Sequence, residues 1–262
     1  MLDALSPQRR RFVLGVIALG VALVLIVVIT TVVGAISARV TPVAQDDQGP
    51  VLLVPGYGGS GASLAPLASA LRSAGRDVVI VSPLGDGTGD LGAQAKHLGA
   101  VVDRVLTDTG AASVDVIGYS AGGVVARAWA RDDGGAGQAR RIVTLGSPQH
   151  GTSQAALGTE LAGQCPPACE QLVPDSDLLR HLNAGDETPR GPLWATVRSS
   201  ADQVVTPVDS AMLEGALNVL VQDVCPRAAT GHGDLPTDPV VVAALGSLLG
   251  TTPPTAPTGV TC

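Results

Sequence analysis

The sequence predicts a protein of the α/β class, in which a mostly parallel sheet is covered by helices on both faces. Short apolar runs rich in Val, Leu and Ile alternate along the chain with longer segments of helical periodicity. The first of these runs is continuously apolar, as expected of a strand that is buried on both faces. Strands that alternate with helices favour an open parallel sheet.

Composition limits the size and the partners of this domain. The chain has 262 residues, of which 45% are hydrophobic but only 2% aromatic, so we expect one domain with an aliphatic core behind the leading segment. The net charge of −7 and the isoelectric point near 4.9 argue against a nucleic-acid partner.

Six strands and four main helices are expected in order. The helix after the first strand begins at Ser63 and ends at Gly75, and Asp90 caps the next one, whose buried stripe starts at Leu91. A third helix follows Ser120, and Asp238 opens the last one. The expected strands cover residues 51–54, 78–82, 114–118, 141–147, 193–199 and 216–221.

The amino-terminal segment is predicted to be a membrane anchor. Arginines at 9–11 precede an apolar run, so we expect a cytoplasmic segment at 1–11, a transmembrane signal-anchor at 12–38 and a linker at 39–50. This places the protein in the cell membrane as a single-pass protein with its folded domain outside the cytoplasm. Cleavage near 35–37 followed by secretion, or a twin-arginine signal, are the alternatives.

The folded domain is predicted to cover residues 51–250, and a Thr- and Pro-rich tail follows at 251–262. A long polar interruption with several prolines, residues 148–192, separates the fourth and fifth strands. Loops of this length are usually functional or disordered, so we expect a small cap over the site.

The pentapeptide Gly-Tyr-Ser-Ala-Gly at 118–122 predicts a nucleophilic serine. It joins a β-branched run to a helix-compatible run, which is the strand–turn–helix context that exposes a serine hydroxyl. The backbone N–H of Ala121 then lies at a helix start, where it can meet a developing oxyanion. The plain alternative is a glycine-rich turn with a surface serine at 120, which candidate partners downstream make less attractive.

The four histidines compete for the role of the base. His232 follows the sixth strand, where the chain order Ser, Asp, His places it. His97 falls inside a helix as a solvated residue, and His181 belongs to the cap. His150 follows the fourth strand and is a candidate pocket residue.

Asp202 is the preferred carboxylate because it follows the fifth strand. Asp223, after the sixth strand, is its main rival, whereas Asp209 and Asp234 are ordinary loop acids.

Five ordered motifs together resemble the small bacterial lipases and esterases of the α/β-hydrolase fold. They lie at residues 54–59, 118–123, 145–152, 199–202 and 231–235. The resemblance implies a minimal six-stranded core, a triad of Ser120, Asp202 and His232, and carboxylic esters with acyl chains as substrates.

The resemblance also implies the surroundings of the site. It assigns the backbone N–H of Tyr57 as the second oxyanion donor. Gly56, Tyr119 and His150 are candidate pocket-lining residues. The common His-Gly of this family is Pro55–Gly56 here, a change that should spare the chemistry because the donor is a backbone group.

Four cysteines in an exported domain suggest two disulfides, with three possible pairings. We favour Cys165 with Cys169 and Cys225 with Cys262; a zinc site is the less favoured alternative.

The sequence therefore predicts a membrane-anchored serine esterase or lipase that acts on an acyl ester or lipid and needs no metal or cofactor. No G-x-G-x-x-G opens a helix and no P-loop is present in the sequence. An acyltransferase on the same fold and a non-catalytic anchored binding domain are the alternatives. The residues alone do not fix the acyl chain length.

Overall fold

The computed structural model describes residues 7–37, 40–156, 165–260 and 262. Contacts within the chain separate it into two units, Met1–Thr41 and Pro42–Cys262.

The first unit contains one helix, α1 (Pro7–Ser37). Its described apolar side chains are exposed. Within the described residues, no helix combines the length and the hydropathy of a membrane span. The predicted transmembrane anchor at 12–38 is therefore not supported.

The second unit is built on a six-stranded sheet in which every neighbouring pair is parallel. The order across the sheet is β2-β1-β3-β4-β5-β6, which confirms the predicted α/β class. Most boundaries fall within two residues of those predicted. The strands are β1 (Val51–Val54), β2 (Val78–Ile80), β3 (Val114–Tyr119), β4 (Ala139–Leu145), β5 (Leu193–Arg198) and β6 (Leu217–Leu220).

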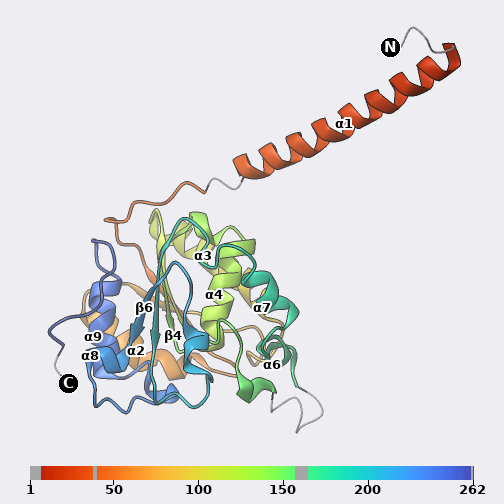
Figure 1. Ribbon diagram of the computed structural model, residues 1–262. Coiled ribbons are helices and arrows are strands. Elements are labelled where there is room, and N and C mark those ends of the chain that lie inside the picture. Colours follow the sequence, from red (N-terminus) through yellow and green to blue (C-terminus); the bar gives the residue numbers. More distant parts are fainter. Residues whose placement is uncertain (1–6, 38–39, 157–164, 261) are drawn as a thin grey trace. The chain divides into compact units, whose positions relative to one another are not determined.

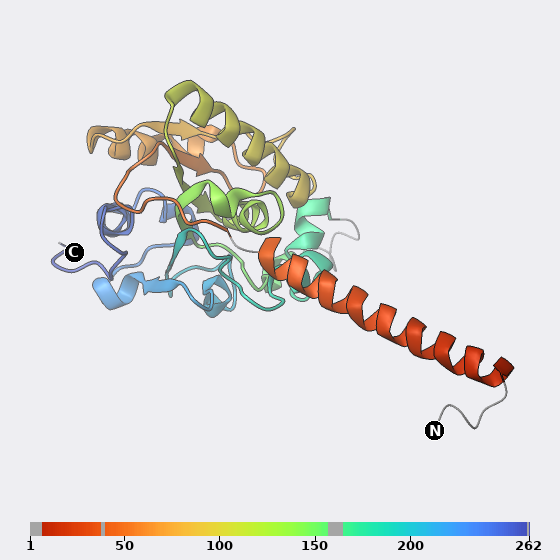
Figure 2. The same ribbon diagram turned by 90° about the horizontal axis from the view of Figure 1, so that it is seen from above.

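Helices cover both faces of this sheet (Figure 1). Alternate residues of β1 show why: Leu52 and Val54 join a core with α3 (Leu91–Thr109) and α4 (Ala121–Asp132), which lie side by side in Figures 1 and 2. Val51 and Leu53 join a second core on the opposite face with the helices α2 (Ala65–Ser73) and α9 (Pro239–Leu248).

Local capping fixes where two of these helices begin. The Asp90 side chain accepts a hydrogen bond of 2.7 Å from the backbone N–H of Ala93, so it caps α3 as predicted. Asp238 accepts from the N–H of Val240 at 2.8 Å at the start of α9. Such bonds satisfy N–H groups that the first helical turn leaves unpaired.

Two short helices, α6 (Pro167–Gln171) and α7 (Asp177–Leu182), lie in the segment predicted to be a cap. Their buried side chains, such as Ala168 and Leu179, join the core formed by α3 and α4. Residues 157–164 of the predicted cap lie outside the described part.

Two arginines of α4 bind the chain at and after the end of α7. The fully buried Arg127 donates from Nη2 to the carbonyl of Leu182 at 2.8 Å and from Nη1 to Oδ1 of Asn183 at 2.6 Å. Arg131 donates to the carbonyls of Ala184 and Asp186 at 2.6 and 2.8 Å. Side-chain cations thus bind the carbonyl of Leu182, at the helix end, and carbonyls of the chain that follows it.

The cysteines pair as predicted, Cys165 with Cys169 and Cys225 with Cys262. The first bond lies at the start of α6, and the second joins the end of α8 (Val221–Val224) to the carboxyl terminus.

A buried ion cluster closes the amino edge of the sheet. Oδ2 of Asp115, on β3, lies 2.6 Å from Nη2 of both Arg76 and Arg140, and the side chains of Asp115 and Arg140 are fully buried. Arg140 also donates to the carbonyls of Leu249 and Gly250, which ties the end of α9 to this edge.

Replacing Asp115 with alanine should destabilise the domain strongly, because a buried guanidinium would lose its counterion. We expect the free energy of unfolding, measured by urea denaturation, to fall by about 3–5 kcal/mol. The control is Asp177→Ala, which breaks the exposed pair of Asp177 with Arg180 and should leave stability nearly unchanged. Equal effects of the two variants would contradict a structural role of the buried cluster.

Candidate active site

Ser120 lies on a sharp turn between β3 and α4 and has a backbone conformation that a serine rarely adopts, φ 53° and ψ −127°. Two glycines make this turn possible. A Cβ atom at Gly118 would collide with the backbone of Gly123, and one at Gly122 would collide with the carbonyl of Val54. A strained backbone of this kind persists only where its surroundings fix it, and such positions cluster at functional sites.

The hydroxyl of Ser120 begins a chain of hydrogen bonds that ends at a buried carboxylate. Nε2 of His232 lies 3.0 Å from Oγ of Ser120, and Nδ1 of His232 lies 2.7 Å from Oδ2 of Asp202. A neutral imidazole that donates from Nδ1 to the carboxylate has Nε2 free to accept the serine proton.

The environment of Asp202 keeps its carboxylate charged. Its Oδ1 accepts hydrogen bonds from the backbone N–H groups of Val204 and Val205 at 2.8 and 2.9 Å. Burial favours the neutral form, but the hydrogen bond from His232 and those from the two backbone groups outweigh it and lower the pKa of Asp202 below its ordinary value.

Tyr119 contacts both the backbone and the ring of His232. Its hydroxyl donates to the carbonyl of His232 at 3.1 Å, and the two rings lie 5.2 Å apart at an angle of 33°. Burial and the nearby carboxylates of Asp202 and Asp234 raise the pKa of Tyr119 to about 12, so it stays a hydrogen-bond donor. Tyr119 was predicted as a pocket residue; in the structure it contacts the histidine instead.

Gly146, which sequence analysis did not single out, lies beside the acid and the base. A Cβ atom there would lie 3.1 Å from Oδ2 of Asp202, 3.2 Å from Nδ1 of His232 and closer still to the side chain of Leu235. Its place directly after β4 was the available signal, because a glycine at a strand end often marks a close approach.

The two predicted oxyanion donors are unpaired in the described part of the chain: neither the N–H of Tyr57 nor that of Ala121 donates a hydrogen bond there. The loop of Tyr57 lies against the serine, since a Cβ atom at Gly56 would be 2.9 Å from Cβ of Ser120. The N–H of Gly58 donates to the carbonyl of Gly87 at 3.3 Å, which holds this loop to the one after β2.

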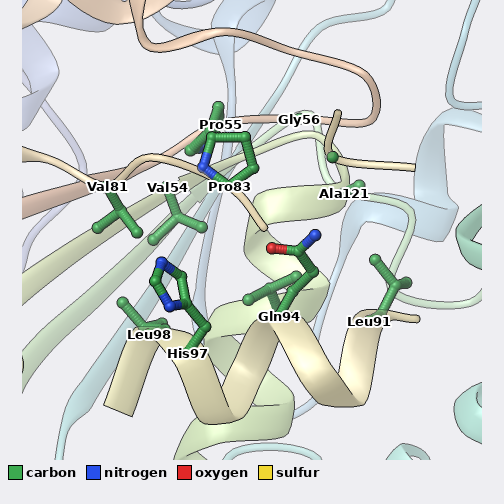
Figure 3. Close-up of a pocket in the computed structure, with 12 residues that line it drawn as sticks. Val54, Pro55, Gly56, Val81, Pro83, Leu91, Gln94, His97, Leu98 and Ala121 are labelled. Atoms are coloured by element: carbon green, nitrogen blue, oxygen red, sulfur yellow. The ribbon is translucent and has the colours of Figure 1, made fainter. Parts of the chain in front are cut away.

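Side chains of α3 bind the loop that follows β2. In Figure 3, Gln94 and His97 project from α3 toward Pro55 and Gly56, and these residues line a small cavity of ≈ 20 Å³. Such a volume holds about one water molecule. The amide of Gln94 bonds the N–H and the carbonyl of Leu84 at 2.9 and 3.0 Å.

His97 was expected to be solvated, but it is half-buried and its Nε2 lies 3.0 Å from the carbonyl of Ser82. The other two rival histidines also lie away from the serine. His150 pairs with Glu187 at 2.8 Å, and His181 pairs with Asp132 at 2.9 Å. Neither Gly56 nor His150 lines the pocket at Ser120 that is described next.

A pocket of ≈ 200 Å³ opens at Ser120 and Tyr57. Its other described lining residues come from three segments. Pro148, Thr152, Gln154 and Ala155 follow β4, Cys169 and Leu172 lie at and just after α6, and Val204 and Val205 follow Asp202. These walls are mainly apolar, as is typical of small-molecule sites.

The rival carboxylates do not reach His232. Asp223 is exposed on α8, Asp209 pairs with Arg198 at 3.3 Å, and Asp234 accepts from the N–H of Gly231 at 3.1 Å. Among the described residues, no group of three or more His, Cys, Asp or Glu side chains could hold a metal ion.

Comparisons with known proteins agree with this architecture. Residues 49–161 match a family model described as the alpha/beta hydrolase fold. The structure of Aspergillus fumigatus lipase B is similar with a TM-score of 0.69 at 19% identity, over 79% of this chain and 54% of that chain. The chain therefore spans about half the length of that lipase.

Two bacterial structures are similar at lower TM-scores. The mature lipase BlEst2 of Bacillus licheniformis has a TM-score of 0.56 at 17% identity, over 69% of this chain and 85% of that chain. A protein of Listeria innocua has a TM-score of 0.57 at 16% identity, over 78% and 94% of the two chains. Identities this low bear on the fold alone, and the chain has the α/β-hydrolase fold.

Proposed function

We propose that this protein is a serine hydrolase that cleaves carboxylic esters through an acyl-enzyme on Ser120. The observation that carries the proposal is the hydrogen-bonded chain from Ser120 through His232 to Asp202, with distances of 3.0 and 2.7 Å. Nucleophile, base and orienting carboxylate in this arrangement are the parts that acyl transfer needs. The lipases among the structures of similar fold support the same reaction class.

In the proposed mechanism, Oγ of Ser120 attacks the ester carbonyl while Nε2 of His232 takes the hydroxyl proton. The imidazolium that forms is stabilised by Asp202, whose carboxylate stays ionised because its pKa is lowered. His232 then gives the proton to the leaving alcohol. Water, deprotonated by the same histidine, attacks the acyl-enzyme and releases the acid and the free serine.

The negative charge of each tetrahedral intermediate would be received by the N–H groups of Tyr57 and Ala121. Both groups lack hydrogen-bond partners within the described chain, so they are available to an oxyanion. One such donor is worth about 3–4 kcal/mol in comparable enzymes. The replacement of His-Gly by Pro55–Gly56 leaves this backbone contribution in place.

The acyl group of the substrate fits the apolar pocket at Ser120. The pocket is lined by Leu172, Val204 and Val205, and none of its described lining residues is charged, which favours an uncharged acyl chain. We propose an acyl ester or a lipid as the substrate.

We also propose that the domain works outside the cytoplasm. Two disulfides form from the four cysteines, and such bonds persist in oxidising compartments. Protease added to intact expressing cells should then degrade the domain, whereas a cytoplasmic control protein survives. Degradation only after lysis would contradict this location.

Replacing Ser120 with alanine should abolish activity without unfolding the protein. Turnover of p-nitrophenyl esters should fall by about 10⁴-fold or more, and a fluorophosphonate probe should label the wild type but not this variant. Asp202→Asn should also lose most activity, because an amide favours the wrong imidazole tautomer. The control is Asp209→Asn, whose side chain pairs with Arg198 at the surface.

Labelling by the probe and the reaction products distinguish a hydrolase from a binding domain and from an acyltransferase. A folded wild type that neither reacts with the probe nor turns over esters would be a binding domain, and the proposal would be wrong. If a competing alcohol or sugar captures the acyl group and little free acid forms, the protein is an acyltransferase.

The charge of Asp202 should also contribute to stability in a pH-dependent way. Because the folded protein lowers the pKa of Asp202, its stabilising contribution is present above the unfolded pKa, about 4, and is lost as pH falls through the lower folded pKa. The difference in free energy of unfolding between the wild type and Asp202→Asn should therefore be constant near neutrality and shrink below about pH 4. Urea denaturation over this range measures it; a difference that grows in acid would contradict the assignment.

A further inference from the structure

The acid and the base are carried by two different loops, which follow β5 and β6. Asp202 lies four residues after the end of β5, and His232 lies in the loop between α8 and α9. Their hydrogen bond of 2.7 Å needs the two loops to keep a fixed separation. A side chain that binds both loops would set that separation.

Gln222, on α8, makes such contacts. Its Oε1 accepts from the backbone N–H of Ser200 at 2.9 Å, and its Nε2 donates to Oγ of Ser199 at 2.9 Å. The same Nε2 donates to the carbonyl of Ala228 at 3.0 Å. The carbonyl and the two N–H groups of a carboxamide are thus matched to one donor and two acceptors.

The contacts to Ser199 and Ser200 act on the turn that carries the acid. Ser199 is fully buried, its Oγ accepts from the N–H of Ala201 at 3.2 Å, and its carbonyl accepts from the N–H of Asp202 at 3.1 Å. A shift of this turn would therefore move Asp202 directly.

The contact to Ala228 acts on the loop that carries the base. The N–H of Ala228 donates to the carbonyl of Cys225 at 2.9 Å, and the hydroxyl of Thr230 donates to Oδ2 of Asp238 at 2.6 Å. With the bond from Tyr119 to the carbonyl of His232, these contacts fix the loop at successive points. Gln222 joins this loop to the loop that carries Asp202.

The helix that carries Gln222 is itself anchored. Val221, the first residue of α8, and Cys225, directly after it, are each 1% exposed and belong to the core shared with α9. The disulfide of Cys225 with Cys262 adds a covalent tie. The amide therefore projects from a fixed base.

We propose that Gln222 is a positioning residue that holds the Asp202 and His232 loops in register for catalysis. This inference rests on the proposed function, because it concerns the rate of the same reaction. Gln222 does not line the pocket at Ser120, so its loss should change the chemical step and leave substrate binding unchanged.

Two variants test the hydrogen bonds of Gln222 to the Asp202 loop and to the His232 loop. Gln222→Leu removes every hydrogen bond. Gln222→Glu keeps an acceptor for the N–H of Ser200 and can accept from the hydroxyl of Ser199, but it offers no N–H to the carbonyl of Ala228. Gln138→Leu is the matched control, since Gln138 lies directly before β4, at the amino end of that strand, and its side chain donates to Oδ1 of Asp103.

We expect both Gln222 variants to lose about 10- to 100-fold in kcat, the effect of small misplacements of catalytic groups, with KM unchanged. Labelling by a fluorophosphonate should slow by the same factor. Gln222→Glu should lose as much kcat as Gln222→Leu, because a link between two loops fails when either end is released. Gln138→Leu should behave as the wild type.

The outcomes separate this inference from the proposed function. A wild type that is neither labelled nor active would refute the proposed function. An active wild type with unaltered kcat in folded Gln222 variants would overturn the positioning role. A rise in KM alone, or activity lost only in proportion to unfolded protein as judged by thermal melting, would assign Gln222 to binding or to stability and would also overturn it.

Discussion

The candidate site depends on the close approach of three backbone segments at the end of β3. Gly118 and Gly122 have no side chains, so the first turn of α4 packs against both β3 and the end of β1 without an intervening atom. This contact holds Ser120 at φ 53° and brings the loop of Gly56 against its Cβ. The nucleophile and the proposed oxyanion donors are therefore placed by the same packing.

The parallel sheet explains how distant residues join this turn. Strands β3, β4, β5 and β6 are neighbours in that order, and all of their carboxyl ends lie along one edge. That edge is where ligands bind in open α/β sheets. Ser120, Gly146 and Asp202 follow β3, β4 and β5 in turn, and His232 comes after β6. Ser120 and His232 are 112 residues apart in the sequence, yet the sheet brings them within one hydrogen bond of each other.

Local sequence signals predicted the sheet and the sharp turn at Ser120. The order of residues after successive strands pointed to Asp202 and His232, which the structure places within hydrogen-bond distance of each other. Continuous apolar runs identify buried strands, and glycines at 118 and 122 identify a turn with no room for side chains. The start of β4 was predicted at Arg141, but the strand begins two residues earlier, at Ala139, and therefore includes Arg140 and Arg141. Both are fully buried, and they reach Asp115 and the carbonyls that follow α9.

Contacts between loops were beyond such signals. Gln222 has no pattern around it, since its partners Ser200 and Ala228 become neighbours only in the folded chain. The same holds for Tyr119, which a motif placed near the serine but whose contact with His232 depends on the last loop. Side-chain partners of this kind follow from tertiary geometry rather than from local periodicity.

Helix α4 connects the turn of Ser120 to the segment that contains α6 and α7. Its first turn follows Ser120, and its buried Arg127 binds the chain that ends α7. Burial lowers the pKa of Arg127 to about 10, so the guanidinium remains charged at neutral pH and keeps these carbonyls bound. On the other side, the carbonyl of Leu172 accepts from the N–H of Thr152 at 3.0 Å. This hydrogen bond joins two segments of the pocket at Ser120, because Thr152 and Leu172 both line it.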